Sequence, residues 1–131
     1  MARLDEVLLE SNTPCVLVAH SLGCHLVSAW AAHTRLVARV RAALLVAPSD
    51  PERDDAPPQI YNWRPVVRQR LPFQSLLVAS SNDPVCSLAQ AAVFAADWGS
   101  GWCLLGAHGH INGDSALGDW DAGHALLKSL A

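Results

Sequence analysis

Short apolar stretches of strand-favouring residues alternate with longer helical stretches along the chain, and this alternation is the strongest constraint on the fold. Strands are expected over residues 15–19, 41–47, 74–80 and 101–106. Apolar spacing and helix-favouring composition predict helices over residues 3–10, 21–40, 86–99 and 118–131. Strands that alternate with helices are typical of a parallel sheet with helices on its faces. We therefore expect the α/β class, as a three-layer sandwich around a mostly parallel sheet.

The composition fits a chain whose strands are buried on both sides. Hydrophobic residues make up 51% of the sequence and charged residues only 16%. Strands of a helix-covered parallel sheet read as continuous apolar runs, which produces this balance and argues against disorder. A length of 131 residues suits one domain with a real core. We expect a single domain over residues 1–131.

One segment interrupts the alternation. Residues 48–72 are rich in proline and acidic side chains. Proline restricts its own backbone and that of the preceding residue, so this segment is expected to be a long excursion with one short helix.

Charge and hydropathy exclude several classes of partner. The net charge is −3, without the basic footprint of a nucleic-acid-binding protein. No apolar run approaches the roughly 20 residues that span a bilayer, and the first residues lack the pattern of a signal peptide. None of the four cysteines lies in a C-x-x-C pair, which favours reduced thiols. We expect a cytoplasmic protein with no membrane, nucleic-acid or cofactor partner.

Polar residues that can act as nucleophiles, acids or bases follow each expected strand. In parallel sheets, ligands bind beyond the carboxyl ends of the strands. The residues found there, in chain order, are Ser21, Asp50, Asn82 with Asp83, and His108 with His110. A serine, carboxylates and histidines are therefore predicted to meet at one edge of the sheet.

The stretch AHSLG, residues 19–23, has the shape of the G-x-S-x-G nucleophile elbow, with alanine in the first position. The elbow needs small residues beside its sharp turn, and Ala19 and Gly23 are small. Ser21 would then lie at a helix N-terminus, where the N–H of Leu22 could bind an oxyanion. The alternative is that Ser21 only caps the helix, because serine is among the commonest N-caps.

The order of the residues favours the nucleophile. Strand-Ser-helix, then strand-Asp, then strand-loop-His is the chain order of α/β-hydrolases, and Ser21, Asp83 and His110 follow it. A serine hydroxyl needs a base to take its proton, and imidazole titrates near neutral pH. A carboxylate fixes the imidazole tautomer and stabilises the imidazolium that forms.

Four stretches, VLVAHSLG, PFQSLLVASSNDPVC, GAHGHIN and LGDW, resemble the serine hydrolase family typified by retinoblastoma-binding protein 9. The resemblance extends over essentially the whole chain and implies a partial α/β-hydrolase fold. It places the nucleophile at Ser21, the acid at Asp83 and the base at His110. It also implies carboxylesterase-like cleavage of small-molecule esters through an acyl-enzyme.

Other residues compete for these roles. His108 is the alternative base, but the family pattern favours His110 and leaves His108 to line the mouth of the site. Asp50 and Asp97 are the alternatives to Asp83, which would also form an Asn-Asp-Pro turn. His20 either packs under neighbouring loops or touches the substrate.

A metal site is a further alternative. His108, His110 and His124 are close in sequence, and an H-x-H pair on a loop could bind zinc. No further ligand has the spacing of a zinc protease, so no metal is expected.

The resemblance also predicts a departure from the family. Family members begin with a strand, a loop that gives a second oxyanion donor, and a helix, of which only residues 3–10 correspond to the end. The domain is therefore expected to be N-terminally incomplete. The strand at 15–19 would then be an exposed apolar edge that invites a homodimer, and the loss of one oxyanion donor costs about 2.7–4 kcal/mol in the transition state. The alternative function is a non-catalytic α/β-hydrolase remnant that acts through protein association.

Overall fold

The computed structural model describes residues 2–10, 13–111 and 121–130. Helices and strands alternate as the sequence predicts. In chain order the elements are α1 (Ala2–Leu9), β1 (Cys15–His20), α2 (Leu22–His33), β2 (Val40–Val46), β3 (Gln74–Ala79), α3 (Leu88–Trp98), β4 (Gly101–Leu104) and α4 (Asp121–Leu130). Two 3-10 helices, η1 (Val37–Arg39) and η2 (Pro58–Trp63), lie in the connections.

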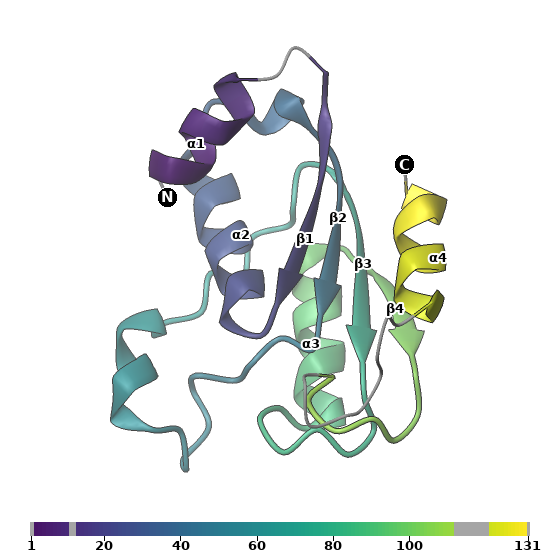
Figure 1. Cartoon of the computed structure of the whole chain (residues 1–131). Helices are drawn as coiled ribbons and strands as arrows, with labels where there is room; N and C mark the ends of the chain where they lie inside the picture. Colours follow the sequence, from purple (N-terminus) through teal and green to yellow (C-terminus); the bar gives the residue numbers. More distant parts are fainter. Residues whose placement is uncertain (1, 11–12, 112–120, 131) are drawn as a thin grey trace.

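The four strands form one parallel sheet in the order β1-β2-β3-β4. The register pairs Leu17 with Ala43, Ala43 with Ser75, and Leu77 with Trp102. All four strands run the same way, so their carboxyl ends share one edge of the sheet (Figure 1). The α/β class with a parallel sheet is confirmed.

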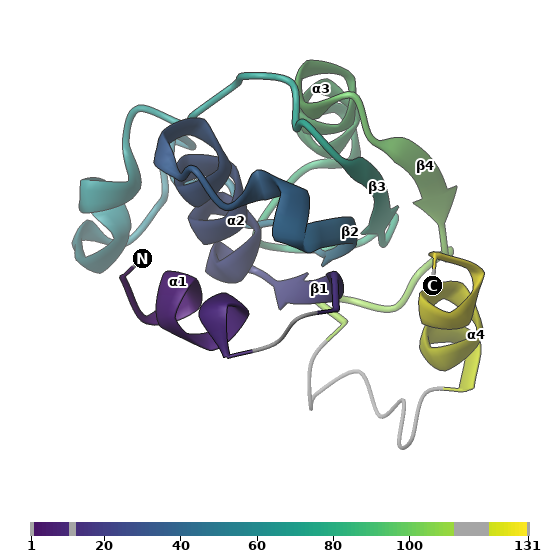
Figure 2. The ribbon, with the colours of Figure 1, turned by 90° about the horizontal axis from the view of Figure 1, so that it is seen from above.

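The helices make three layers with the sheet. Helices α2 and α3 cover one face and α4 covers the other, while α1 packs beside α2 near the edge strand β1 (Figure 2). Leu8 of α1 is buried against Trp30 of α2 and Val40 at the start of β2. The two central strands are therefore buried, and the outer strands β1 and β4 are only partly covered.

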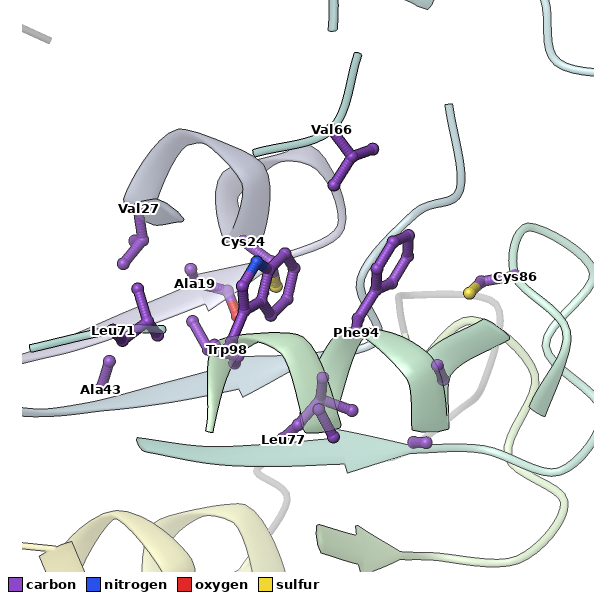
Figure 3. Close-up of a cluster of buried hydrophobic side chains, with 14 residues drawn as sticks. Ala19, Cys24, Val27, Ala43, Val66, Leu71, Leu77, Cys86, Phe94 and Trp98 are labelled. Carbon is purple, nitrogen blue, oxygen red and sulfur yellow. The ribbon is translucent and has the colours of Figure 1, made fainter. Parts of the chain in front are cut away.

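The larger core cluster fills the space between the sheet and the helices α2 and α3 (Figure 3). Phe94 and Trp98 of α3 stack with ring centroids 5.2 Å apart, and Leu77 of β3 lies beneath them. The Trp98 indole N–H donates to the Val67 carbonyl at 2.8 Å, so its polar group is satisfied. Burying such side chains stabilises the fold by about 1.5–3 kcal/mol each. This cluster supports the helix that follows β1.

One predicted helix is wrong in its second half. The sequence predicts a helix over residues 21–40, but α2 ends at His33 and Thr34 is extended, with φ −80° and ψ 155°. The Thr34 hydroxyl accepts the Leu36 N–H at 3.1 Å and donates to Asp5 at 2.8 Å. Side chains of this type offer the backbone an alternative to the helix. The released residues form η1 and begin β2.

The excursion over residues 48–72 contains one short helix, η2, as expected. Arg68 ties it to α3: its guanidinium lies 2.6 Å from Glu52 and 3.0 Å from Asp97. The segment is therefore held against the domain next to the carboxyl end of β2.

The four cysteines are free thiols. Burial, with a smaller contribution from the charges of Asp50 and Asp83, raises the pKa of Cys86 to about 12. This thiol stays protonated at neutral pH. Among the described residues, no helix combines the length and the apolar character needed to cross a membrane.

Candidate active site

Ser21 stands in a strained turn between β1 and α2. Its backbone has φ 60° and ψ −122°, a conformation that side-chain-bearing residues adopt rarely. The Ser21 N–H donates to the Val46 carbonyl at 3.1 Å, which fixes the turn to the end of β2. The hydroxyl makes no capping hydrogen bond to α2, although Ser21 occupies the N-cap position. The side chain is thus directed to something other than its helix.

The Ser21 hydroxyl lies against His110, and His110 lies against Asp83. Ser21 Oγ is 2.9 Å from His110 Nε2. His110 Nδ1 is 2.9 Å from Asp83 Oδ2 and 3.0 Å from Oδ1. The Asp83 side chain is only 4% exposed and that of His110 11%. The carboxylate accepts Nδ1–H, which leaves the Nε2 lone pair to accept the serine proton.

Asp83 forms a turn as well as the contact with His110. Its Oδ1 accepts the Val85 N–H at 2.8 Å, which is an Asx-turn ahead of α3. The two alternative acids are bound elsewhere: Asp50 accepts the N–H of Glu52, and Asp97 pairs with Arg68. The structure therefore brings Asp83 to the histidine.

The loop that carries His110 is held by two side chains that follow β3. Ser80 Oγ accepts the His108 N–H at 2.8 Å, and Asn82 Oδ1 accepts the Gly109 N–H at 2.7 Å. Ser80 also donates to Asn82 at 3.0 Å, so the two act together. The backbone of Gly109 is left-handed, with φ 60°, which suits glycine. These contacts fix the imidazole of His110 by its main chain.

The remaining predicted residues surround the triad. His20 is exposed; its Nε2 donates to the His110 carbonyl at 2.8 Å, and the two rings lie 4.8 Å apart. His108 is half-buried beside them. Leu22 is the first residue of α2, and the first N–H groups of a helix have no partner within it. The role of its N–H as an oxyanion donor stays a prediction.

Sequence reasoning missed Ser49 and His25. Ser49 is 2% exposed, and its Oγ is 2.5 Å from Ser21 Oγ. Its carbonyl accepts a hydrogen bond at 2.5 Å from Nε2 of His25, which is 3% exposed on α2. Burial lowers the pKa of His25, so this imidazole is neutral. The only signal in the sequence was the position of Ser49 in the turn that follows a predicted strand, just after Pro48.

Two grooves lie beside α2. An apolar groove of about 450 Å³ runs beside β1 and is lined by Leu17, Val18, His20 and Gly23 with residues of α1 and α2. A second groove of about 350 Å³ lies between α2 and η2, where Trp63 is one wall. Both grooves include Leu26, so this residue of α2 separates them.

Within residues 2–10, 13–111 and 121–130, no group of three or more histidine, cysteine and acidic side chains is placed to hold a metal ion. The side chain of His124 and the LGDW stretch at residues 117–120 lie outside what the structure describes.

A parallel sheet with a serine in a strained turn after one strand, and an acid and a histidine after later strands, defines the α/β-hydrolase class of fold. Residues 1–129 match the model of a family described as serine hydrolase, and the chain belongs to this family. The narrower resemblance to the branch typified by retinoblastoma-binding protein 9 stays a prediction.

Solved structures give the same fold. A protein described as a YdeN-like hydrolase of Pectobacterium atrosepticum has a TM-score of 0.74 and 28% identity, over 97% of this chain and 63% of that one. The Bacillus cereus carboxylesterase has a TM-score of 0.63 and 17% identity, over 98% of this chain and 57% of that one. A monoacylglycerol lipase of Paleococcus ferrophilus has a TM-score of 0.68 and 11% identity, over 98% of this chain and 72% of that one. At these low identities, the last two show a likeness of fold alone.

The chain spans less than two thirds of the Pectobacterium and Bacillus proteins that it matches. No curated protein sequence matches it at a significant level.

Proposed function

We propose that this protein is a serine hydrolase of carboxylesterase type that cleaves small acyl esters through an acyl-enzyme. One observation carries the proposal: Ser21 Oγ, His110 and Asp83 form a continuous hydrogen-bonded row with separations of 2.9 Å at both contacts. A nucleophile within reach of a base that a third group orients is the arrangement that covalent catalysis needs.

Each residue has one part in the proposed reaction. His110 Nε2 takes the proton of Ser21 as Oγ bonds to the ester carbonyl carbon. The Leu22 N–H donates to the oxyanion at the N-terminus of α2. As the tetrahedral intermediate collapses, the carbon–oxygen bond to the alcohol breaks and His110 gives the alcohol its proton. Asp83 holds the imidazole tautomer throughout.

The surroundings of the triad support a small and largely apolar ester as the substrate class. The 450 Å³ groove beside β1 is lined mainly by aliphatic side chains and reaches His20 and Gly23 at the elbow. The similar folds include proteins named as a carboxylesterase and a monoacylglycerol lipase, which agrees with ester chemistry. His20 and His108, which flank the triad, are the residues proposed to face the substrate.

Labelling with a fluorophosphonate tests the proposal, because this probe reacts only with an activated serine. The parent chain is incubated with the probe and the adduct is read by intact mass. We expect one adduct, which Ser21→Ala and His110→Ala abolish. Ser75→Ala and His33→Ala, which change a buried serine and an exposed histidine away from the site, should keep it. An unlabelled parent chain, or an adduct that survives Ser21→Ala, contradicts the proposal.

A second candidate function is association without catalysis, through the edge of β1. Among the described strands β1 pairs with β2 alone, and the side chain of its Val18 is 58% exposed. Free strand edges pair readily with another chain. We propose a homodimer as the form that this association takes.

A further inference from the structure

The hydroxyl of Ser49 has no part in the mechanism given above, yet it touches the reacting oxygen. Its Oγ lies 2.5 Å from Ser21 Oγ, at the short end of the range for O–H···O hydrogen bonds. The residue is 2% exposed, so the hydroxyl cannot turn to solvent. A buried polar group in contact with the nucleophile needs an explanation.

The direction of this hydrogen bond follows from the tautomer of His110. The Asp83 carboxylate only accepts, so Nδ1 of His110 carries the proton and Nε2 of the neutral ring is an acceptor. Ser21 must therefore give its single hydroxyl proton to Nε2, 2.9 Å away. Nothing remains for Ser21 to donate to Ser49. Ser49 is the donor, and Ser21 Oγ accepts from it.

The backbone around Ser49 is built to hold this donor. Ala47, at the end of β2, has φ 47°, and its N–H donates to the Val78 carbonyl at 2.8 Å. The Ser49 carbonyl accepts from His25 Nε2, on the same helix whose N-terminus carries Ser21. The ring of His25 packs edge-on against Phe94 and Trp98, with ring centroids 5.3 and 5.5 Å apart. The distance between the two serines is thus fixed through one helix.

We propose that Ser49 is a further catalytic residue, which donates a hydrogen bond to Ser21 Oγ during acylation and deacylation; this inference rests on the proposed serine hydrolase function. A hydroxyl oxygen has four tetrahedral directions. In Ser21 they are taken by Cβ, by the proton directed to His110 and by the donor Ser49. One lone pair remains, and the substrate carbon approaches along it.

The second half-reaction uses the same hydrogen bond. His110 takes a proton from water, and the water oxygen bonds to the acyl carbon. The bond between that carbon and Ser21 Oγ then breaks, its electron pair stays on Oγ, and Oγ receives the proton from His110. The charge that develops on Oγ is stabilised by the Ser49 O–H, which keeps its own proton throughout.

Four variants test this role: Ser49→Ala, Ser49→Cys, Ser75→Ala and Ser21→Ala. Ser75 is the matched control, because it is a buried serine bonded to another serine, Ser100, at 2.7 Å. The second-order rate of fluorophosphonate labelling and the kcat and KM for p-nitrophenyl acetate are measured, with thermal unfolding as the check on folding. Ser49→Cys keeps nearly the same volume with a weak donor, and it serves if Ser49→Ala does not fold.

We expect Ser49→Ala to label about 10- to 100-fold more slowly, the range for a hydrogen bond to a charged group. Its kcat should fall with KM little changed, Ser49→Cys should lie between it and the parent, and Ser75→Ala should match the parent. Labelling of Ser49→Ala or Ser49→Cys at the rate of Ser75→Ala overturns the inference, as does an adduct on Ser49 in Ser21→Ala. A parent chain that does not label overturns the proposed function, and the inference with it.

Discussion

Ser21, Ala47 and Ile111 have positive φ values of 60°, 47° and 52°, although none of them is glycine. Such conformations cost on the order of 1–3 kcal/mol each and persist where the surrounding structure fixes them. Here the first carries the nucleophile, the second leads to Ser49, and the third follows His110. Backbone strain therefore coincides with the segments that the proposed mechanism uses.

Replacing Asp83 by asparagine tests its orienting role. Asparagine can present an N–H to Nδ1 and so favour the tautomer in which Nε2 holds a proton and cannot act as the base. The labelling rate of Asp83→Asn should fall by a factor of about 10⁴, as for the corresponding change in trypsin-type proteases. Asp50→Asn, the change at the nearest alternative acid, should leave the rate close to that of the parent. If both variants lost the same labelling rate, the loss would reflect a disturbed fold, and the orienting role of Asp83 would be contradicted.

His25 predicts a pH dependence of stability. Burial lowers the pKa of His25 in the folded protein below its ordinary value of 6.5. At a pH between the lowered pKa of the folded protein and the ordinary pKa of the unfolded chain, the unfolded chain binds more protons than the folded one. The free energy of unfolding therefore falls as the pH drops below about 6.5. His25→Gln should flatten this fall in urea titrations between pH 7.5 and 5. His33→Gln, on the same helix but exposed, should keep the parent slope; equal slopes in parent and His25→Gln would contradict the prediction.

The residues of the triad were predictable because chain order and strand ends determine which side chains can meet. Ser49 was not, since the adjacent Asp50 looked the more reactive choice. The left-handed backbone of Ala47 decides that Ser49, and not Asp50, contacts Ser21. Alanine rarely adopts this conformation, so the sequence does not indicate the turn. His25 was equally hidden: it reads as one more residue of α2, and only the packed fold shows its bond to the Ser49 carbonyl.

At the scale of elements, the end of α2 shows where local pattern gives way to tertiary contacts. Helical residues continue in sequence well past His33, so pattern alone extends the helix to residue 40. The Asp5 carboxylate of α1 accepts hydrogen bonds from Trp30 at 2.6 Å and Thr34 at 2.8 Å. This contact crosses more than twenty residues of sequence, and so periodicity could not reveal it.

Removing the charge of Asp5 should loosen α1. Hydrogen bonds from Trp30 and Thr34 lower the pKa of Asp5 below its ordinary 3.8. Its stabilising effect is therefore present above about pH 3.8 and is lost as the pH falls from there through the folded-state value. Asp5→Asn should unfold at lower denaturant than the parent at pH 7, and the gap should narrow below pH 3.8. Glu10→Gln, an exposed change beyond the end of the same helix, is the control; a gap that stays constant with pH would contradict the prediction.

At the scale of the whole molecule, the alternation of strands and helices was sufficient to predict a parallel sheet and its layers. Among the described strands β1 lies at one edge of the sheet, and apart from the buried Ala19 its side chains are half-buried or exposed. The N-terminally incomplete domain expected from the family resemblance stays a prediction. An exposed edge strand can pair with the same strand of a second copy of the chain.

Edge-to-edge pairing of two β1 strands predicts that the chain forms a dimer that a charge can disrupt. Val18→Lys places a cation on the exposed side of the edge strand, and lysines on edge strands are one way natural proteins block such pairing. Light scattering after size exclusion should give a dimer for the parent and a monomer for Val18→Lys. Val93→Lys, a similarly exposed valine on α3, should stay dimeric. A monomeric parent chain would refute the homodimer.

The strained residues at the carboxyl edge of the sheet also bear on how this protein could evolve. Selection for heat resistance alone would favour glycine at position 47, since glycine relieves a positive φ and only the methyl group of Ala47 is lost. It would keep Ile111, whose buried side chain packs in the core. Glycine at position 47 would also free the segment that directs Ser49 to the nucleophile. Thermal tolerance and turnover would then be traded against each other at this edge of the sheet.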